Sequence, residues 1–299
     1  MHDSHIHLTR EPLISNIKEI VERFLQNNGK YILSQATEVE DFDNNIKLTK
    51  IFPNVVQASV GIHPTIFEEI TVGKSINSGK EENEDCDIFL VGQNQINAFE
   101  KYFRKHTKDI CAVGECGLDY YQFSTNVSYS EDTIEQLKEI QKLSFRKHLQ
   151  LAKEFKLPLS IHARDVFGST ECVEDTIRLV AEEGNGILQG SFHSYTGDIK
   201  FVQQILDLGF HIGFNGIITY KSGESVREIL KQTPLERILF ETDGPFLPPQ
   251  SVRKNNHIKE KFAQPYDVKE IMETASEIKG IPYEELEKTT DENYSLLFL

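Results

Sequence analysis

The sequence has few cysteines and no long apolar run. None of the four cysteines forms a Cys-x-x-Cys pair, so the sequence predicts free thiols rather than a disulfide framework. No apolar stretch approaches the roughly 18–20 residues that a membrane-spanning helix needs. The first residues also lack the basic and then apolar pattern of a signal peptide. We therefore expect a cytoplasmic protein, with the nucleus as the alternative, and no membrane partner.

Positive charge is scarce as well. The chain has 32 Lys and Arg against 47 Asp and Glu, a formal net charge of −15. This balance argues against a protein that coats nucleic acid through a basic surface. It leaves open a nuclease that holds one or two phosphates through bound cations, because cations offset the charge of the carboxylates that bind them. Residues 250–265 are a basic exception, which is a solvated connection or a functional loop.

A glycine-rich phosphate loop is also missing. The first apolar run is followed by HLTREPLI, which argues against a doubly wound dinucleotide-binding sheet. Helical periodicity is clearest over 131–156 and 197–209. Such segments alternate with eight nearly continuous apolar runs, typical of strands buried on both faces: 3–8, 31–37, 55–63, 110–119, 157–164, 186–194, 210–216 and 237–244. We predict one α/β domain, 1–299, folded as a single (β/α)8 TIM barrel with a polar surface insertion around 71–87.

Side chains that bind metals recur where the predicted strands end. His5 and His7 are two residues apart, so both lie on one face of their strand. In a barrel, the carboxyl ends of the strands meet at one face, where active sites lie. Buried imidazoles and carboxylates without partners would cost several kcal/mol each, and shared cations remove most of that cost. The pattern therefore predicts one metal site built from His5, His7, Glu115, His162, His193 and Asp243, with His63 beside it as a candidate contact to substrate.

Several stretches together resemble the TatD family of metal-dependent deoxyribonucleases, within the amidohydrolase-like barrels. They occur in order across nearly the whole chain: DSHIHL, VGIHP, VGECGLDYY, LPLSIHARD, SFHSYTGD, GFNG, FETDGPFLPP and DENYSLLFL. Thr65 departs from the pattern, since many relatives carry a histidine there. The insertion at 71–87 is also longer than expected for the family.

The resemblance implies a centre with two divalent cations. His5, His7 and Asp243 would bind one ion, His162 and His193 the other, and the Glu115 carboxylate would bridge them. A bridging carboxylate suits cations about 3.5–4 Å apart, as in two-metal hydrolases. Imidazole ligands suit Zn²⁺, Mn²⁺ or Co²⁺, and the resemblance points to Mg²⁺ or Mn²⁺.

The reaction that this centre predicts is hydrolysis of a phosphodiester, with nucleic acid (DNA, alternatively RNA) as the substrate. The cations would activate a water, with Asp243 as general base and Glu115 as the second catalytic carboxylate. His63 or a water would protonate the leaving oxygen. Action on single strands or frayed ends, in the manner of an exonuclease, fits the acidic chain best.

Other side chains near these motifs are candidate substrate contacts. Arg164 would clamp a phosphate or pair with Asp165. Tyr120 and Tyr121 would stack on a base or pack in their loop. Two other functions stay open: an ester or amide hydrolase, such as an aminoacyl-tRNA deacylase, and a metal-stabilised scaffold without activity.

Overall fold

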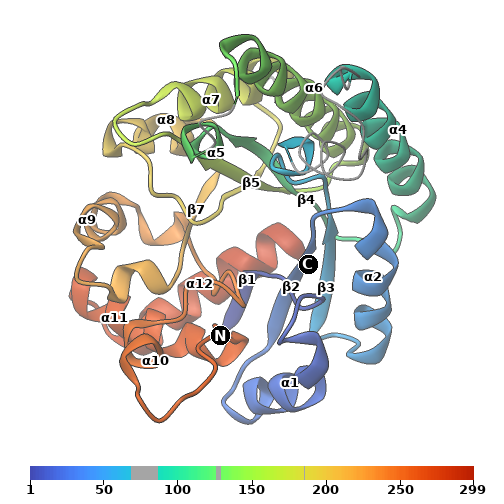
Figure 1. Cartoon of the computed structure of the whole chain (residues 1–299). Coiled ribbons are helices and arrows are strands. Elements are labelled where there is room, and N and C mark those ends of the chain that lie inside the picture. Colours follow the sequence, from blue (N-terminus) through green and yellow to red (C-terminus); the bar gives the residue numbers. More distant parts are fainter. Residues whose placement is uncertain (69–86, 126–128, 185) are drawn as a thin grey trace.

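The computed structural model of the chain is a barrel of parallel strands surrounded by helices (Figure 1). It describes residues 1–68, 87–125, 129–184 and 186–299. Each strand pairs in parallel with the next one in sequence, so the order around the sheet is β1 to β8. The strands are β1 His2–Ile6, β2 Tyr31–Ala36, β3 Val56–Val60, β4 Ala112–Asp119, β5 Leu159–Arg164, β6 Gly190–Phe192, β7 His211–Phe214 and β8 Ile238–Phe240. This order confirms the predicted (β/α)8 barrel.

Helices follow the strands and cover the outside of the barrel. Those in the described residues are α1 Ile17–Gln26, α2 Phe42–Ile51, α4 Ile88–His106, α5 Tyr121–Thr125, α6 Glu131–Phe155, α7 Glu171–Gly184, α8 Val202–Asp207, α9 Glu224–Gln232, α10 Gln250–Lys254, α11 Val268–Lys279 and α12 Tyr283–Phe298. No helix in this part of the chain is long and apolar enough to cross a bilayer. The insertion predicted around 71–87 lies, apart from Asp87, outside the described residues and stays a prediction.

The two predicted helices are both present. Helix α6 fills 131–155 of the predicted 131–156. The Ser130 hydroxyl caps it by accepting a hydrogen bond from the backbone N–H of Thr133. The second, predicted over 197–209, is a short 3-10 turn, Ile199–Phe201, that runs into α8. Apolar spacing therefore located both helices, and their ends shifted by a few residues.

Several strands are shorter than predicted at their carboxyl ends. β3 ends at Val60 rather than 63, and β8 ends at Phe240 rather than 244. The chain turns sharply just beyond β6 and β8, where Ser194 (φ 46°) and Asp243 (φ 55°) adopt left-handed backbone conformations. His63 and Asp243 therefore lie in the turns that follow the strands. The same holds for His7, one residue past β1, and for His193, one residue past β6.

The first and last strands meet along a seam at the carboxyl end of the barrel. The Asp243 N–H donates to the His5 carbonyl at 2.8 Å, and the His7 N–H donates to the Gly244 carbonyl at 2.8 Å. The buried Asp3 carboxylate adds two bonds, from the Thr242 N–H at 3.0 Å and hydroxyl at 2.6 Å. These bonds fix Asp243 beside His5 and His7.

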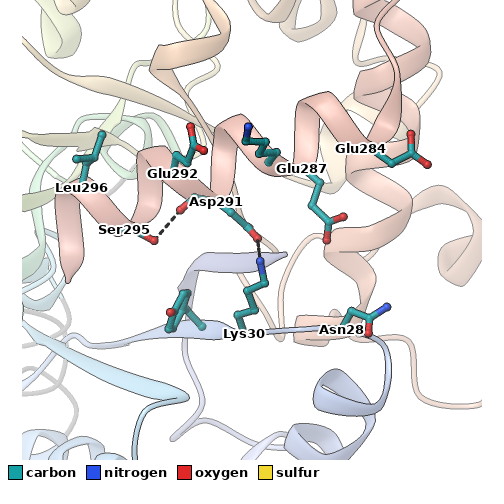
Figure 2. Close-up of a pocket in the computed structure, with 10 residues that line it drawn as sticks. Asn28, Lys30, Glu284, Glu287, Asp291, Glu292, Ser295 and Leu296 are labelled. Atoms are coloured by element: carbon teal, nitrogen blue, oxygen red, sulfur yellow. Dashed lines mark hydrogen bonds and ion pairs between the residues drawn. The ribbon is translucent and has the colours of Figure 1, made fainter.

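Helix α12 closes the opposite end of the barrel. Its Tyr294 and Phe298 rings pack into a small apolar cluster with Leu33, Ala112 and Leu239 from three strands. A pocket of about 910 Å³ lies beside this helix, lined by α12 and the start of β2 (Figure 2). Two of its charged side chains, Lys30 and Asp291, form an ion pair at 2.8 Å. The two ends of the barrel therefore differ, with packing and ion pairs at this end and the histidine cluster at the other.

Replacing Asp291 with Asn should lower the free energy of unfolding by about 2–4 kcal/mol at pH 7, because the carboxylate is buried against His2 and Lys30. Burial raises the pKa of Asp291, but His2 and Lys30 outweigh it, so that pKa lies below its ordinary value. A lowered carboxyl pKa adds stability above the unfolded value of about 3.9, and this is lost as the pH falls below it. Urea unfolding at pH 7 and pH 3 measures both effects.

The difference in the free energy of unfolding between the wild type and Asp291→Asn should thus be smaller at pH 3 than at pH 7. Glu292→Gln, on the same helix and lining the same pocket, is the matched control. Equal unfolding free energies for the two variants at pH 7 would show that the Asp291 ion pairs contribute no stability.

Candidate metal centre

Six strands and the turns that follow them bring the predicted ligands and His63 to one place. His5, Glu115 and His162 lie within β1, β4 and β5. The others directly follow β1, β3, β6 and β8: His7, His63, His193 and Asp243. All seven side chains converge at the carboxyl ends of the strands, the end at which barrel enzymes hold their active sites.

Glu115 lies at the middle of this cluster, and one of its oxygens faces the first and last strands. Its Oε2 is 3.3 Å from His5 Nε2 and 3.4 Å from His7 Nε2. The Asp243 Oδ1 atom is 3.4 Å from His7 Nε2 and 3.8 Å from His5 Nε2. These three side chains and Oε2 form one set of donor atoms.

The other Glu115 oxygen faces three further histidines. Its Oε1 is 2.7 Å from His193 Nε2, 3.0 Å from His162 Nδ1 and 3.3 Å from His63 Nε2. The structure thus places His63 inside the cluster, where the sequence predicted a contact to substrate. His63 Nδ1 lies 2.7 Å from the Thr65 hydroxyl, so Thr65 orients the ring at the position where many relatives were expected to carry a histidine.

The charges in the cluster depend on one another. Burial opposes ionisation of Glu115, but the imidazoles of His193, His63 and His5 outweigh it and hold the pKa of Glu115 well below its ordinary value. Burial also lowers the pKa of His162, yet Asp119 and Glu115 raise it to about 9. Burial dominates for His5 and His63, whose pKa values lie below the ordinary one.

A second layer of buried groups orients these rings. Asp119 Oδ2 is 3.0 Å from His162 Nε2, which turns His162 Nδ1 toward Glu115. Glu241 Oε1 is 3.5 Å from His193 Nδ1 and accepts a hydrogen bond from the Ser194 N–H at 2.6 Å. Carboxylates that hold the far nitrogen of a histidine are typical outer partners of metal ligands.

Neither of these carboxylates was predicted from the sequence, although the spacing contained a signal. Asp119 is four residues after Glu115, and Glu241 is two residues before Asp243. Even spacings along a strand place side chains on the same face, so both acids could have been assigned to the site.

Two of the candidate substrate contacts, Arg164 and Tyr121, lie at the edge of the cluster. The Arg164 guanidinium is 3.8 Å from the centroid of the Tyr121 ring, and Arg164 is exposed. The alternative pairing with Asp165 is wrong: in the described part of the chain its carboxylate accepts the backbone N–H groups of Cys172 and Val173 instead. The stacking role suggested for Tyr120 is also wrong, because that ring is 2% exposed.

The donor atoms fit divalent cations. They form three overlapping groups of three, each with all atoms within 4.8 Å of one another: His5, His193 and Asp243; His5, His7 and Glu115; His63, Glu115 and His162. Among the described residues, the buried His5 Nε2 atom has no hydrogen-bond partner. Imidazole nitrogen and carboxylate oxygen are the ligands of Zn²⁺, Mn²⁺ and related ions.

A family model described as TatD related DNase matches residues 2–299. The chain belongs to the TatD family. A Buchnera aphidicola protein named as an uncharacterized metal-dependent hydrolase is 34% identical over 99% of this chain and 98% of its own length. A Danio rerio relative, "Putative deoxyribonuclease tatdn3", is 24% identical over 99% of this chain and 96% of its own. The protein is a metal-dependent hydrolase of the TatD family.

Solved structures of TatD proteins share the fold. The Escherichia coli TatD homologue YJJV superposes with a TM-score of 0.77 at 22% identity, covering 100% of this chain and 97% of that one. A TatD family hydrolase from Entamoeba histolytica gives a TM-score of 0.76 at 20% identity, covering 100% and 98%. These likenesses confirm the barrel architecture of this TatD protein.

Proposed function

We propose that this TatD protein is a deoxyribonuclease that hydrolyses phosphodiester bonds with two divalent cations, and that the whole chain, 1–299, acts as one hydrolase domain. The arrangement of Glu115 carries the proposal. Its two oxygens face two separate sets of donors, as a carboxylate that bridges two cations would. In this assignment His5, His7 and Asp243 bind one ion, and His162 and His193 bind the other. His63 is a further candidate for the second ion, since it approaches Oε1 to 3.3 Å.

The proposed chemistry divides between the cations and the protein. Bound cations would lower the pKa of water toward about 7 and offset charge on the phosphate. The Asp243 carboxylate would accept the proton of the attacking water, and the pKa of Asp243 is held below its ordinary value by the neighbouring His7 and His193 despite burial. Asp119 and Glu241 would keep His162 and His193 in fixed orientations, so that the site needs little rearrangement during the reaction.

The exposed edge of the cluster supports binding of nucleic acid. Arg164 would bind the substrate phosphate, because a guanidinium binds two phosphate oxygens at once and this one is exposed. Its stacking on Tyr121 would limit the conformations that the guanidinium can adopt. We further propose a cytoplasmic location, since the thiols of Cys111, Cys116 and Cys172 are free, as is usual in reducing compartments.

Removing divalent cations tests this proposal. Dialysis against EDTA should abolish release of nucleotides from single-stranded DNA, because cations would no longer offset the phosphate charge or activate the attacking water. Adding back Mg²⁺, Mn²⁺ or Zn²⁺ one at a time, with the bound metal measured, should restore activity and identify the ion.

An aminoacyl ester in parallel reactions serves as the alternative substrate. Nucleotide release that survives EDTA would refute the metal-dependent mechanism. Release of only the acyl group would refute the nuclease and favour an ester hydrolase.

A further inference from the structure

Residues 250–262, between β8 and α11, are positively charged although the chain is acidic. They follow Asp243 in the chain and include α10. Residues 250–262 contain four Lys or Arg and one Glu, a formal net charge of +3 on a chain of net charge −15. Figure 1 shows α10 and the chain after it at the rim of the barrel, beside α11 and away from α4 and α6. A basic segment of this kind attracts polyanions even though the chain as a whole is acidic.

An aromatic ring just before this segment lies against the cluster. The turn after β8 is closed by a hydrogen bond of 3.0 Å from the Phe246 N–H to the Asp243 carbonyl. The Phe246 ring lies 5.8 Å from the His7 ring between centroids, at an interplanar angle of 70°. Phe246 is 50% exposed, although most phenylalanine rings of this protein are buried. A half-exposed ring beside a candidate ligand is suited to stacking on a base.

Hydrogen bonds at Pro248 and Gln250 attach the start of α10 to the neighbouring loop of the barrel. The Tyr220 hydroxyl donates to the Pro248 carbonyl at 2.8 Å, and the Gln250 N–H donates to the Thr219 hydroxyl at 2.8 Å. Because both partners follow β7, the segment after β8 is held against its neighbour. Ligand contacts made by such a fixed loop need little ordering on binding.

Arg253 is held on the same support. Its guanidinium lies 4.2 Å from the centroid of the Tyr220 ring. Burial raises the pKa of Tyr220. Arg253 lowers this pKa and the Asp243 carboxylate raises it, so both charges act on the Tyr220 hydroxyl. Arg253 is exposed. Such a guanidinium suits a backbone phosphate.

The loop after β2, at the same end of the barrel, has the opposite charge. The loop after β2 carries three carboxylates, Glu38, Glu40 and Asp41, and would repel a phosphate backbone. A bound strand would therefore leave the centre over the segment after β8 rather than over the loop after β2.

We propose that residues 244–262 form a subsite for single-stranded nucleic acid, in which the base next to the cleaved bond stacks on Phe246 and the following phosphate binds Arg253. The subsite rests on the proposed nuclease function. Lys254, Lys259 and Lys261, all exposed, add attraction for phosphates further along the strand.

Equilibrium binding tests the subsite without turnover. Binding of fluorescein-labelled hexathymidylate is measured by anisotropy on proteins that also carry Asp243→Asn, which slows cleavage. Phe246→Ala should weaken binding about tenfold, and Phe246→Tyr should restore it, since a tyrosine ring also stacks. Arg253→Gln should weaken binding and lower the slope of log affinity against log salt by about 0.7.

Controls come from the opposite end of the barrel and from an exposed helix. Ile51→Ala removes a side chain that is 62% exposed at the end of α2, and Lys18→Gln removes a lysine on α1 that is 84% exposed. Neither should change the affinity or the salt slope. Equal affinities for Phe246→Ala and Ile51→Ala would overturn the subsite.

A kinetic comparison separates stacking from a structural role of Phe246. In an otherwise wild-type protein, Phe246→Ala should lower the ratio of kcat/KM for hexathymidylate to that for methyl p-nitrophenyl phosphate. A parallel fall for both substrates together with lost metal would mean that Phe246 only positions His7, which overturns the subsite. If wild-type protein cleaves no oligonucleotide, the proposed function itself fails. If it cleaves them and Phe246→Ala matches Ile51→Ala, only the subsite fails.

Discussion

Replacing Asp243 with Asn should lower kcat by about 10²–10⁴-fold, the usual contribution of a general base. The amide has almost the same shape as the carboxylate but accepts no proton from the attacking water. Asn also tolerates the left-handed conformation that residue 243 adopts (φ 55°), so the fold should survive the change. Single-turnover rates on single-stranded DNA, with saturating metal, measure the effect.

Asp207→Asn is the matched control, because Asp207 is exposed at the end of α8. It should leave kcat unchanged. Since Asp243 is also a candidate ligand, bound metal must be measured in both variants. A near-wild-type kcat for Asp243→Asn at full metal content would remove Asp243 from the role of base.

Glu115→Gln should have the second large effect, because one side chain faces both sets of donors. The amide retains the volume of the side chain but removes the charge that the surrounding imidazoles and cations require. We expect kcat/KM to fall by about 10³-fold or more, as loss of several kcal/mol of metal-derived stabilisation implies. Bound metal should fall at the same time, since a neutral amide is a weak ligand beside five histidines.

Thermal unfolding provides a readout that is independent of activity. Metal at about 100 times its Kd should stabilise the wild type by about 2.7 kcal/mol, and this increment should largely disappear in Glu115→Gln. The control is Glu135→Gln, exposed on α6, which should keep both the metal and the increment. Unchanged metal content in Glu115→Gln would refute the bridging role.

The sequence predicted the barrel because its strands are buried on both faces and are therefore apolar along their length. Polar residues stand out against such runs, which is why His5, Glu115 and His162 could be placed at one end of the barrel from the sequence alone. The third and eighth predicted strands are too long, since they extend to residues 63 and 244. The sequence pattern does not distinguish a polar residue that ends a strand from one that lies in the turn beyond it.

What could not be predicted depends on the direction of side chains. Whether His63 points into the cluster or toward the substrate depends on the turn after β3 and on its contact with Thr65. Two adjacent tyrosines likewise differ in their surroundings. Tyr120 is buried with its hydroxyl 2.8 Å from Asp175, whereas Tyr121 stacks on Arg164. Neither difference is visible in a sequence that reads simply Tyr-Tyr.

The seam between β1 and β8 has a consequence for how the protein is made. Asp243 leaves the ribosome more than 230 residues after His5 and His7. The donor set shared by these three residues cannot be complete until nearly the whole barrel has been synthesised. A nascent chain therefore presents only partial binding sites, and cations that bind the finished centre join the two ends of the sheet. All three donors, His5, His7 and Asp243, are available to a cation only after synthesis has passed β8.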